Sequence, residues 1–83
     1  PALVTRDDGS FLVAGWMPVD EFGDQLKLAI PRDAKYETVA GYVLSVINRL
    51  PAVGETFEHD GWKFEIMDLD GRRIDKVLMT RLE

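Results

Sequence analysis

The stretch Tyr36–Pro51 reads YETVAGYVLSVINRLP, and the rest of the chain must fold so as to cover it. At about 100° per residue its apolar side chains share one arc of roughly 160°, the pattern of an amphipathic helix with a wide buried face. Thr38 can cap the first turn and Pro51 cannot continue the backbone hydrogen bonds, which predicts a helix from about Thr38 to Leu50. The residues of the apolar arc are Val39, Ala40, Val43, Leu44, Val46, Ile47 and Leu50.

Two shorter patterns precede this helix. Apolar runs over residues 3–6 and 11–16 flank the turn sequence DDGS, in which Asp and Gly favour a tight reversal, so we expect an N-terminal β-hairpin. Pro18 suits a first helical turn, and acidic residues follow it near the positive end of the helix dipole. The sequence therefore predicts a short helix over residues 19–26.

Three strand patterns follow the main helix, over residues 56–58, 62–69 and 74–82. Asp60-Gly61 fits a type I′ hairpin, since both positions of that turn need a positive φ. Met67 and Leu69 interrupt the alternation of the second strand, which suggests either a bulge or a strand that is covered on both sides at its end. The element order is ββααβββ, and the predicted fold class is α+β, a two-layer sandwich in which an antiparallel meander is covered by one main helix.

This fold predicts which side chains lie inside. We expect both tryptophans, Trp16 and Trp62, to be largely buried, with their indole N–H groups satisfied by backbone oxygen or water. We expect the last strand to be an edge that could join a partner, which leaves a homodimer open. The predicted centre of the core is Val43, Ile47, Leu50, Phe64 and Ile66.

Composition excludes several classes of function. With 15 acidic and 10 basic residues the formal charge is -5, which argues against binding of nucleic acid or an anionic membrane as the main role. The chain has no cysteine, so it forms no disulfide and offers neither a thiolate zinc site nor a cysteine nucleophile. No apolar run approaches the ~20 residues of a membrane span, and we expect no direct membrane insertion by this domain.

Catalytic and metal-binding patterns are few. The single histidine, His59, lies in a predicted hairpin tip, far along the sequence from the serines, so no nucleophile–base pair is apparent and we predict neither an enzyme nor a cofactor. Acidic pairs offer oxygen ligands to divalent cations, although pairs of this kind also occur in ordinary turns. The candidate metal ligands are Asp7, Asp8, Asp68 and Asp70.

A stripe of small residues lies opposite the apolar arc of the main helix, at Gly41, Ser45 and Asn48. Small side chains let another backbone approach closely. The stripe is therefore a candidate interaction face for the loop before the helix, a preceding domain or a second copy; the alternative is that it faces solvent.

Five segments together resemble a known family: DGSFLVAG at 8–15, PVDEF at 18–22, YETVAGYVL at 36–44, LPAVGE at 50–55 and DGRRI at 70–74. They are similar, in order, to the transporter-associated domain named after CorC and HlyC. The resemblance implies a C-terminal domain that follows paired CBS domains in bacterial hemolysin-like and magnesium/cobalt-efflux proteins. It also implies a fold similar to a flavin-binding oxidase domain, although no residue set here forms a pyrophosphate site. Because the chain starts at Pro1, we expect an excised fragment of such a protein.

Two functional hypotheses follow from the resemblance. The first is a non-catalytic regulatory module that modulates ion transport through contacts with the preceding CBS domains or a second copy. The second is a direct sensor of divalent cations that uses the acidic pairs. The resemblance implies a location in the cytoplasm, or at the cytoplasmic face of the inner membrane if the parent protein spans it.

Overall fold

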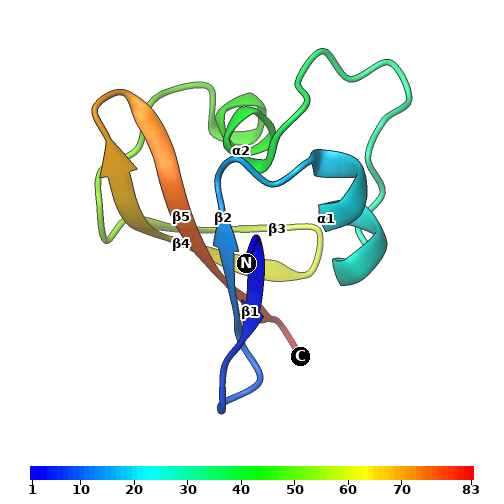
Figure 1. The fold of residues 1–83 in the computed structure, drawn as a ribbon, viewed down its shortest axis with the longest axis vertical. Coiled ribbons are helices and arrows are strands. Elements are labelled where there is room, and N and C mark those ends of the chain that lie inside the picture. Colours follow the sequence, from blue (N-terminus) through cyan, green and yellow to red (C-terminus); the bar gives the residue numbers. More distant parts are fainter.

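A computed structural model describes all 83 residues as one five-stranded antiparallel sheet with two helices at one side (Figure 1). The strands are β1 (Leu3–Thr5), β2 (Phe11–Ala14), β3 (Thr56–His59), β4 (Trp62–Asp70) and β5 (Arg73–Arg81), and the helices are α1 (Val19–Leu26) and α2 (Val39–Ile47). The predicted α+β class and the order ββααβββ are confirmed. Neither helix is long and apolar enough to cross a membrane.

The N-terminal hairpin joins the C-terminal meander, and the strand order is β1-β2-β5-β4-β3. β5 pairs with β2 on one side, where Val13 faces Val77, and with β4 on the other, where Phe64 faces Met79. The last strand is therefore central, and the expectation that it forms an edge was wrong. Its free side is taken by β2, so the edges of the sheet are β1 and β3.

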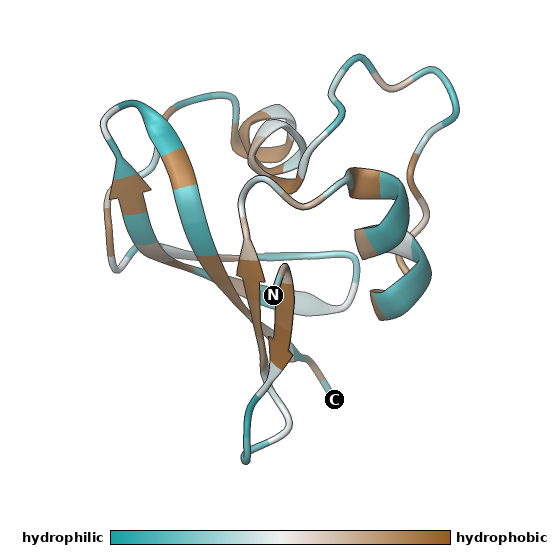
Figure 2. Ribbon diagram, in the orientation of Figure 1, coloured by the Kyte–Doolittle hydropathy of each residue, from teal (hydrophilic) through white to brown (hydrophobic).

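Alternate residues of the central strands point toward the helices and form the core. Figure 2 shows the apolar positions as brown bands along the strands and on one side of each helix. Full burial of each such side chain contributes about 1.5–3 kcal/mol, and both helices contribute to the layer that covers the sheet. The buried members include Val13, Phe64, Ile66, Val77 and Met79 from the sheet, Val19, Phe22 and Leu26 from α1, and Val39, Tyr42 and Val43 from α2.

α2 begins where the sequence predicts and ends earlier. The Gly41 N–H donates to the Thr38 Oγ1 at 3.3 Å, which confirms the N-cap. Asn48 takes a left-handed conformation with φ 59° and ends the helix, since Asn tolerates that region better than most residues. Leu50 consequently leaves the apolar arc and is 39% exposed, and Ile47 is only partly buried, so their predicted places at the core centre were wrong.

The two tryptophans differ. Trp62 is buried as expected, whereas Trp16 is 61% exposed, so the prediction that it is buried was wrong. The chain leaves β2 in a turn in which the Met17 N–H donates to the Ala14 carbonyl at 3.1 Å. Met17 then takes the inward position at 1% exposure, and the indole of Trp16 lies outside.

The late turns follow their sequence signals. Asp60 and Gly61 have φ of 52° and 84°, as the type I′ hairpin requires. β4 shifts register against β5 between Ile66 and Leu69, so the bulge is the one of the two predicted alternatives that the structure shows.

Candidate functional site

The first acidic pair stabilises a turn. One carboxylate oxygen of Asp8, Oδ1, accepts hydrogen bonds from the Ser10 N–H at 2.9 Å and from the Ser10 hydroxyl at 2.6 Å. These bonds, the hydroxyl first, lower the pKa of Asp8 because they favour its charged form. Asp8 therefore has a structural task in the β1–β2 turn, and its neighbour Asp7 is exposed beside it.

In the second acidic pair, Asp68 and Asp70, a third aspartate, Asp75, lies close by. Asp68 and Asp70 lie at the end of β4, and the carboxyl of Asp75 on β5 comes close to them. A hydrogen bond with Asp68, followed by desolvation and by repulsion from Asp68 and Asp70, raises the pKa of Asp75, which Lys76 partly opposes. Carboxylates this close disfavour each other's charge, and a cation between them would relieve that repulsion.

Asp75 was not among the sequence candidates. The bulge of β4 places Asp68 opposite Lys76, the neighbour of Asp75. The local sequence does not show which residue of the partner strand lies opposite a bulge. No three His, Cys, Asp or Glu side chains are placed so that they could hold a metal ion. The metal-binding role of Asp7, Asp8, Asp68 and Asp70 thus stays a prediction.

An aromatic cluster surrounds Tyr42 of α2 and includes residues of both helices and of the sheet. The ring centroids of Phe22, Tyr36 and Phe64 lie 5.6, 5.8 and 6.2 Å from that of Tyr42. The Tyr42 hydroxyl is buried and has no hydrogen-bond partner. Burial, assisted by the charge of Asp60, raises the pKa of Tyr42 to about 12. A buried hydroxyl of this kind costs stability.

His59 belongs to the same neighbourhood. Its ring packs edge-on to Tyr42 with centroids 6.1 Å apart, and its Nε2 lies 3.3 Å from the Asp60 carboxylate. The side chain is 37% exposed. No serine or threonine hydroxyl is hydrogen-bonded to it, so the geometry gives it a packing role in the β3–β4 turn.

The small-residue stripe of α2 is divided between two environments. A Cβ at Gly41 would lie 2.7 Å from the Tyr36 Cβ, so the absence of a side chain at Gly41 allows the loop that precedes the helix to pack against it. The Ser45 hydroxyl donates to the Tyr42 carbonyl at 2.7 Å, and Asn48 ends the helix; both residues are exposed. Contact of this face with another protein stays a prediction.

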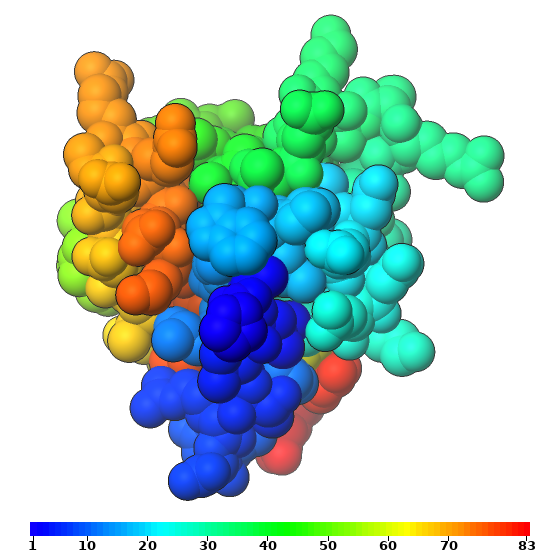
Figure 3. Space-filling view, in the orientation of Figure 1, coloured from blue at the N-terminus to red at the C-terminus, as the bar shows by residue number.

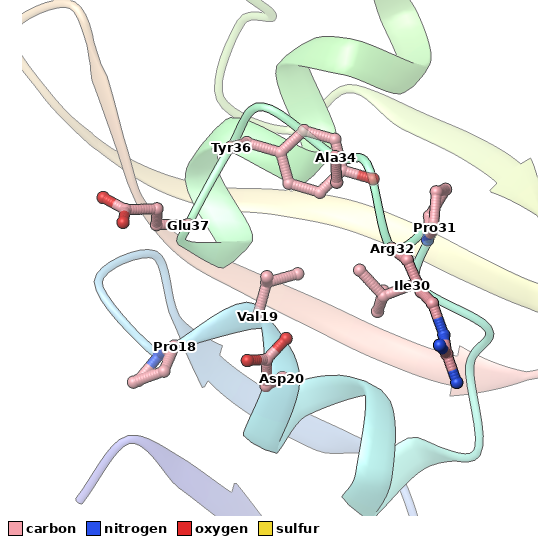
Figure 4. A pocket seen from close by; sticks show the side chains of 9 residues that line it. All are labelled: Pro18, Val19, Asp20, Ile30, Pro31, Arg32, Ala34, Tyr36 and Glu37. Carbon is pink, nitrogen blue, oxygen red and sulfur yellow. The ribbon is translucent and has the colours of Figure 1, made fainter.

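A hollow of about 510 Å³ lies between the start of α1 and the connection to α2 (Figure 4). Figure 4 shows Val19 and Ile30 between its walls, with the Tyr36 ring on one side and the guanidinium of Arg32 directed away from the other side chains. The full lining is Pro18, Val19, Asp20, Ile30, Pro31, Arg32, Ala34, Tyr36 and Glu37. Its size suits a small ligand, but it contains neither a histidine nor a hydroxyl–base pair.

A second hollow, of about 390 Å³, lies at the exposed tryptophan, and we call it the Trp16 groove. Three segments form it: the turn after β2, the start of α2 and the β4–β5 turn. The approach is close, because a Cβ at Gly15 would lie 1.9 Å from the Ile74 carbonyl oxygen. The lining is Gly15, Trp16, Thr38, Ala40, Leu44, Arg72, Arg73 and Ile74. The sequence interpretation missed this site, although an arginine pair in a turn was a signal for it.

Residues 4–83 match the family model CorC_HlyC, described as a transporter associated domain. The chain belongs to this family. The match covers nearly the whole chain, from β1 to the C-terminus, so the elements that form the Trp16 groove and those that carry Asp68, Asp70 and Asp75 all lie within it. The resemblance seen in the five sequence segments is confirmed.

Relatives of this CorC/HlyC domain have transport-related names. A polyamine export protein of Salmonella typhimurium is 35% identical over 98% of this chain, which spans 18% of that relative. The CorC/HlyC domain of a Xylella fastidiosa hemolysin, solved in complex with Mg²⁺ and Mn²⁺, is 46% identical, with a TM-score of 0.85 and full coverage of both chains. A CorC/HlyC domain from Nitrosomonas europaea is 29% identical, with a TM-score of 0.89 over 98% of this chain and 96% of that one.

Proposed function

We propose that this CorC/HlyC domain is a non-catalytic accessory module of a hemolysin-like or magnesium/cobalt efflux-type protein. It modulates transport through contacts with preceding CBS domains of the same polypeptide or with a second copy. The family match over residues 4–83 carries the proposal. The exposed Trp16 groove supports it, since a tryptophan and two arginines on one surface are typical of protein contacts.

The cargo of the parent protein, in this proposal, is a cation. One relative is named a polyamine export protein, and polyamines are positively charged. A second relative, the Xylella fastidiosa domain, was solved with two divalent metals. The module would act at the cytoplasmic face of the inner membrane in a parent protein that spans it.

Deletion in the full-length parent protein tests this function. Residues 1–83 are replaced by a flexible linker, and export of Mg²⁺, Co²⁺ and a polyamine from cells is measured together with the oligomer size of the purified protein. We expect altered export or altered assembly with an unchanged amount of protein in the membrane. Normal export of all three cations and a normal oligomer would overturn the proposal.

A second candidate function is direct sensing of divalent cations by an acidic pair, Asp68 with Asp70. The observation that favours it is the close approach of the Asp68 and Asp75 carboxyls, which raises the pKa of Asp75. The structure of the 46% identical domain with Mg²⁺ and Mn²⁺ adds support.

Calorimetric titration of the 83-residue chain with Mg²⁺, Mn²⁺, Co²⁺ and Ca²⁺ tests this sensor. We expect heat of binding that is lost in Asp68→Asn and retained in Asp7→Asn, the matched change in the other acidic pair. An absence of heat at millimolar metal would dispose of the sensor. Heat lost in Asp7→Asn instead would move the site to the β1–β2 turn.

A further inference from the structure

We propose that the Trp16 groove docks an acidic protein segment that inserts an apolar side chain beside Trp16 and sets its carboxylates on Arg72 and Arg73. This inference rests on the proposed function of the domain as a contact module, and it names the surface and the chemistry of the partner. The groove is formed by three segments that meet at one end of the molecule, the end of β2, the start of α2 and the β4–β5 turn (Figure 1).

The apolar part of the groove can hold a side chain. Trp16 is 61% exposed and stands beside Leu44 and Ile74, which come from α2 and β5. Large exposed aromatic surface next to aliphatic side chains gains free energy when a partner covers it. The volume of about 390 Å³ suits one or two side chains of a bound segment.

The charged part of the groove lacks a partner within the chain. The ion pairs of the structure are Arg49–Glu55 and His59–Asp60, so the guanidinium groups of Arg72 and Arg73 are both unpaired. Asp70 shares a neighbouring hollow with them, and Asp68 and Asp75 lie on the same hairpin, but the charged side chains that line the groove are those of Arg72 and Arg73. Arginine binds carboxylates with two parallel hydrogen bonds, and a partner rich in Asp or Glu supplies them.

The start of α2 does not form a phosphate site. A helix N-terminus binds phosphate through free backbone N–H groups, but those at the start of α2 are used. The Val39 N–H donates to the Met17 carbonyl at 3.0 Å and the Ala40 N–H to the Gly15 carbonyl at 2.9 Å. The Gly41 N–H donates to the Thr38 hydroxyl. Only guanidinium groups remain to receive an anion, and the carboxylates of a protein segment bind them with two parallel hydrogen bonds while its apolar side chain covers Trp16.

The walls of the groove are held in place before any partner arrives. The Gly15 N–H donates to the Asp75 carbonyl at 2.7 Å and ties the turn after β2 to β5. In the space-filling view the β4–β5 turn, coloured orange, stands out from the surface next to α2, coloured green (Figure 3). Preorganised walls reduce the entropy that is lost on binding.

A peptide selection tests the docking proposal. Random 12-residue peptides are displayed and selected on the immobilised 83-residue chain, and the binders are sequenced and titrated with a fluorescent label. We expect enrichment of Asp and Glu together with an aromatic residue or leucine. In the double variant Arg72→Gln/Arg73→Gln we expect the affinity for the selected peptides to fall by about tenfold or more, because the loss of charge-assisted hydrogen bonds reduces affinity by about that factor. Trp16→Ala should weaken binding by a similar factor.

The matched control removes two positive charges elsewhere. Arg32→Gln/Lys35→Gln lies in the exposed connection before α2, outside the groove, and should leave the selected peptides bound with unchanged affinity. All these side chains are exposed, so the variants should fold, which circular dichroism verifies. Selected peptides that are basic or neutral, no enrichment at all, or equal losses in both double variants would overturn the proposal.

Two other occupants are also outcomes of the test. Displacement of the peptide by micromolar inorganic pyrophosphate would assign the groove to a phosphate-bearing ligand and overturn the acidic segment. A dimer of the free chain in light scattering that is lost in Arg72→Gln/Arg73→Gln would assign the groove to a second copy. Deletion of the domain could change export while Arg72→Gln/Arg73→Gln has the same peptide affinity and the same export as the wild type. That result would overturn the docking proposal and leave the proposed function standing.

Discussion

Trp16 and Trp62 both follow a glycine, yet Trp16 is 61% exposed and Trp62 is 2% exposed. Trp62 opens β4 and faces the helix layer, where its ring meets Phe11 edge-on at 5.9 Å and carries the Arg81 guanidinium at 4.4 Å. Trp16 follows β2 in a turn and has no such neighbours. The same Gly-Trp dipeptide therefore places its tryptophan in the core at the start of β4 and on the surface after the end of β2.

The two glycines explain the difference. Gly61 has a φ of 84° and open space around its Cα, so it is needed for the conformation of the turn that places Trp62 in register with Arg81. Gly15 is needed for space, because β5 passes so close that any Cβ would overlap the Ile74 carbonyl. Gly61 allows the backbone conformation of a turn, and Gly15 allows two segments to approach closely. The position of the tryptophan that follows each glycine depends on that local geometry.

Alanine at each tryptophan tests the comparison most strongly. Trp62→Ala should lower the free energy of unfolding by about 3–5 kcal/mol, since it removes a buried aromatic side chain and leaves a cavity. Trp16→Ala, the matched change, should alter it by no more than about 0.5 kcal/mol because the side chain is exposed. Urea unfolding monitored by circular dichroism measures both. Equal losses would mean that Trp16 is packed in solution.

Alanine at the two glycines sharpens the comparison. Gly15→Ala should cost about 3 kcal/mol, because backbone atoms of β5 must shift to admit the new methyl group. Gly61→Ala should cost only about 1 kcal/mol, the strain of a left-handed conformation with no steric overlap. The same urea titrations compare them. A larger loss at Gly61 than at Gly15 would contradict the division of roles.

A smaller effect concerns the one unsatisfied side-chain hydroxyl in the core. Tyr42→Phe should raise the free energy of unfolding by about 1 kcal/mol, because the ring contacts remain and the unpaired hydroxyl is removed. Tyr36→Phe, at the partly exposed neighbour, should leave stability unchanged. A loss of stability in Tyr42→Phe would show that the hydroxyl is hydrogen-bonded in solution.

The same variant has a pH signature. The pKa of Tyr42 is raised from 10.0 to about 12 by burial, so the folded chain retains its phenolic proton when the unfolded chain has lost it. Stability contributed by this group is present below pH 10 and is lost as the pH rises toward 12. Alkaline unfolding between these values should therefore be shallower in Tyr42→Phe than in the wild-type chain.

The smallest effect lies on the surface, near the Trp16 groove. The pKa of Asp75 is raised by Asp68 and Asp70, so the folded chain is destabilised as the pH rises past the ordinary value of 3.8. Asp75→Asn should slightly raise the melting temperature at pH 7, and the gain should vanish below pH 3.8. Asp24→Asn on α1 is the matched control. A gain that persists at low pH would mean that repulsion is not its cause.

Much of the fold follows from local sequence. α1 has the predicted bounds, α2 begins after its predicted cap, and the Asp60-Gly61 hairpin has the predicted geometry. Each of these depends on contacts within a few residues, where the period of apolar side chains and the turn chemistry determine the backbone. The burial of Trp62 and Phe64 follows from the same alternation.

Only the tertiary structure decided the rest. The central place of β5, the exposure of Trp16 and the approach of Asp75 to Asp68 all depend on which strands pair and in what register. The pairing of β2 with β5 joins residues more than sixty positions apart, as Val13 with Val77 shows. Local periodicity tells which face of a strand is apolar, but it carries no information about the neighbour of that strand. The sequence by itself therefore determined the elements and their faces, and long-range packing determined the surface on which the proposed contacts depend.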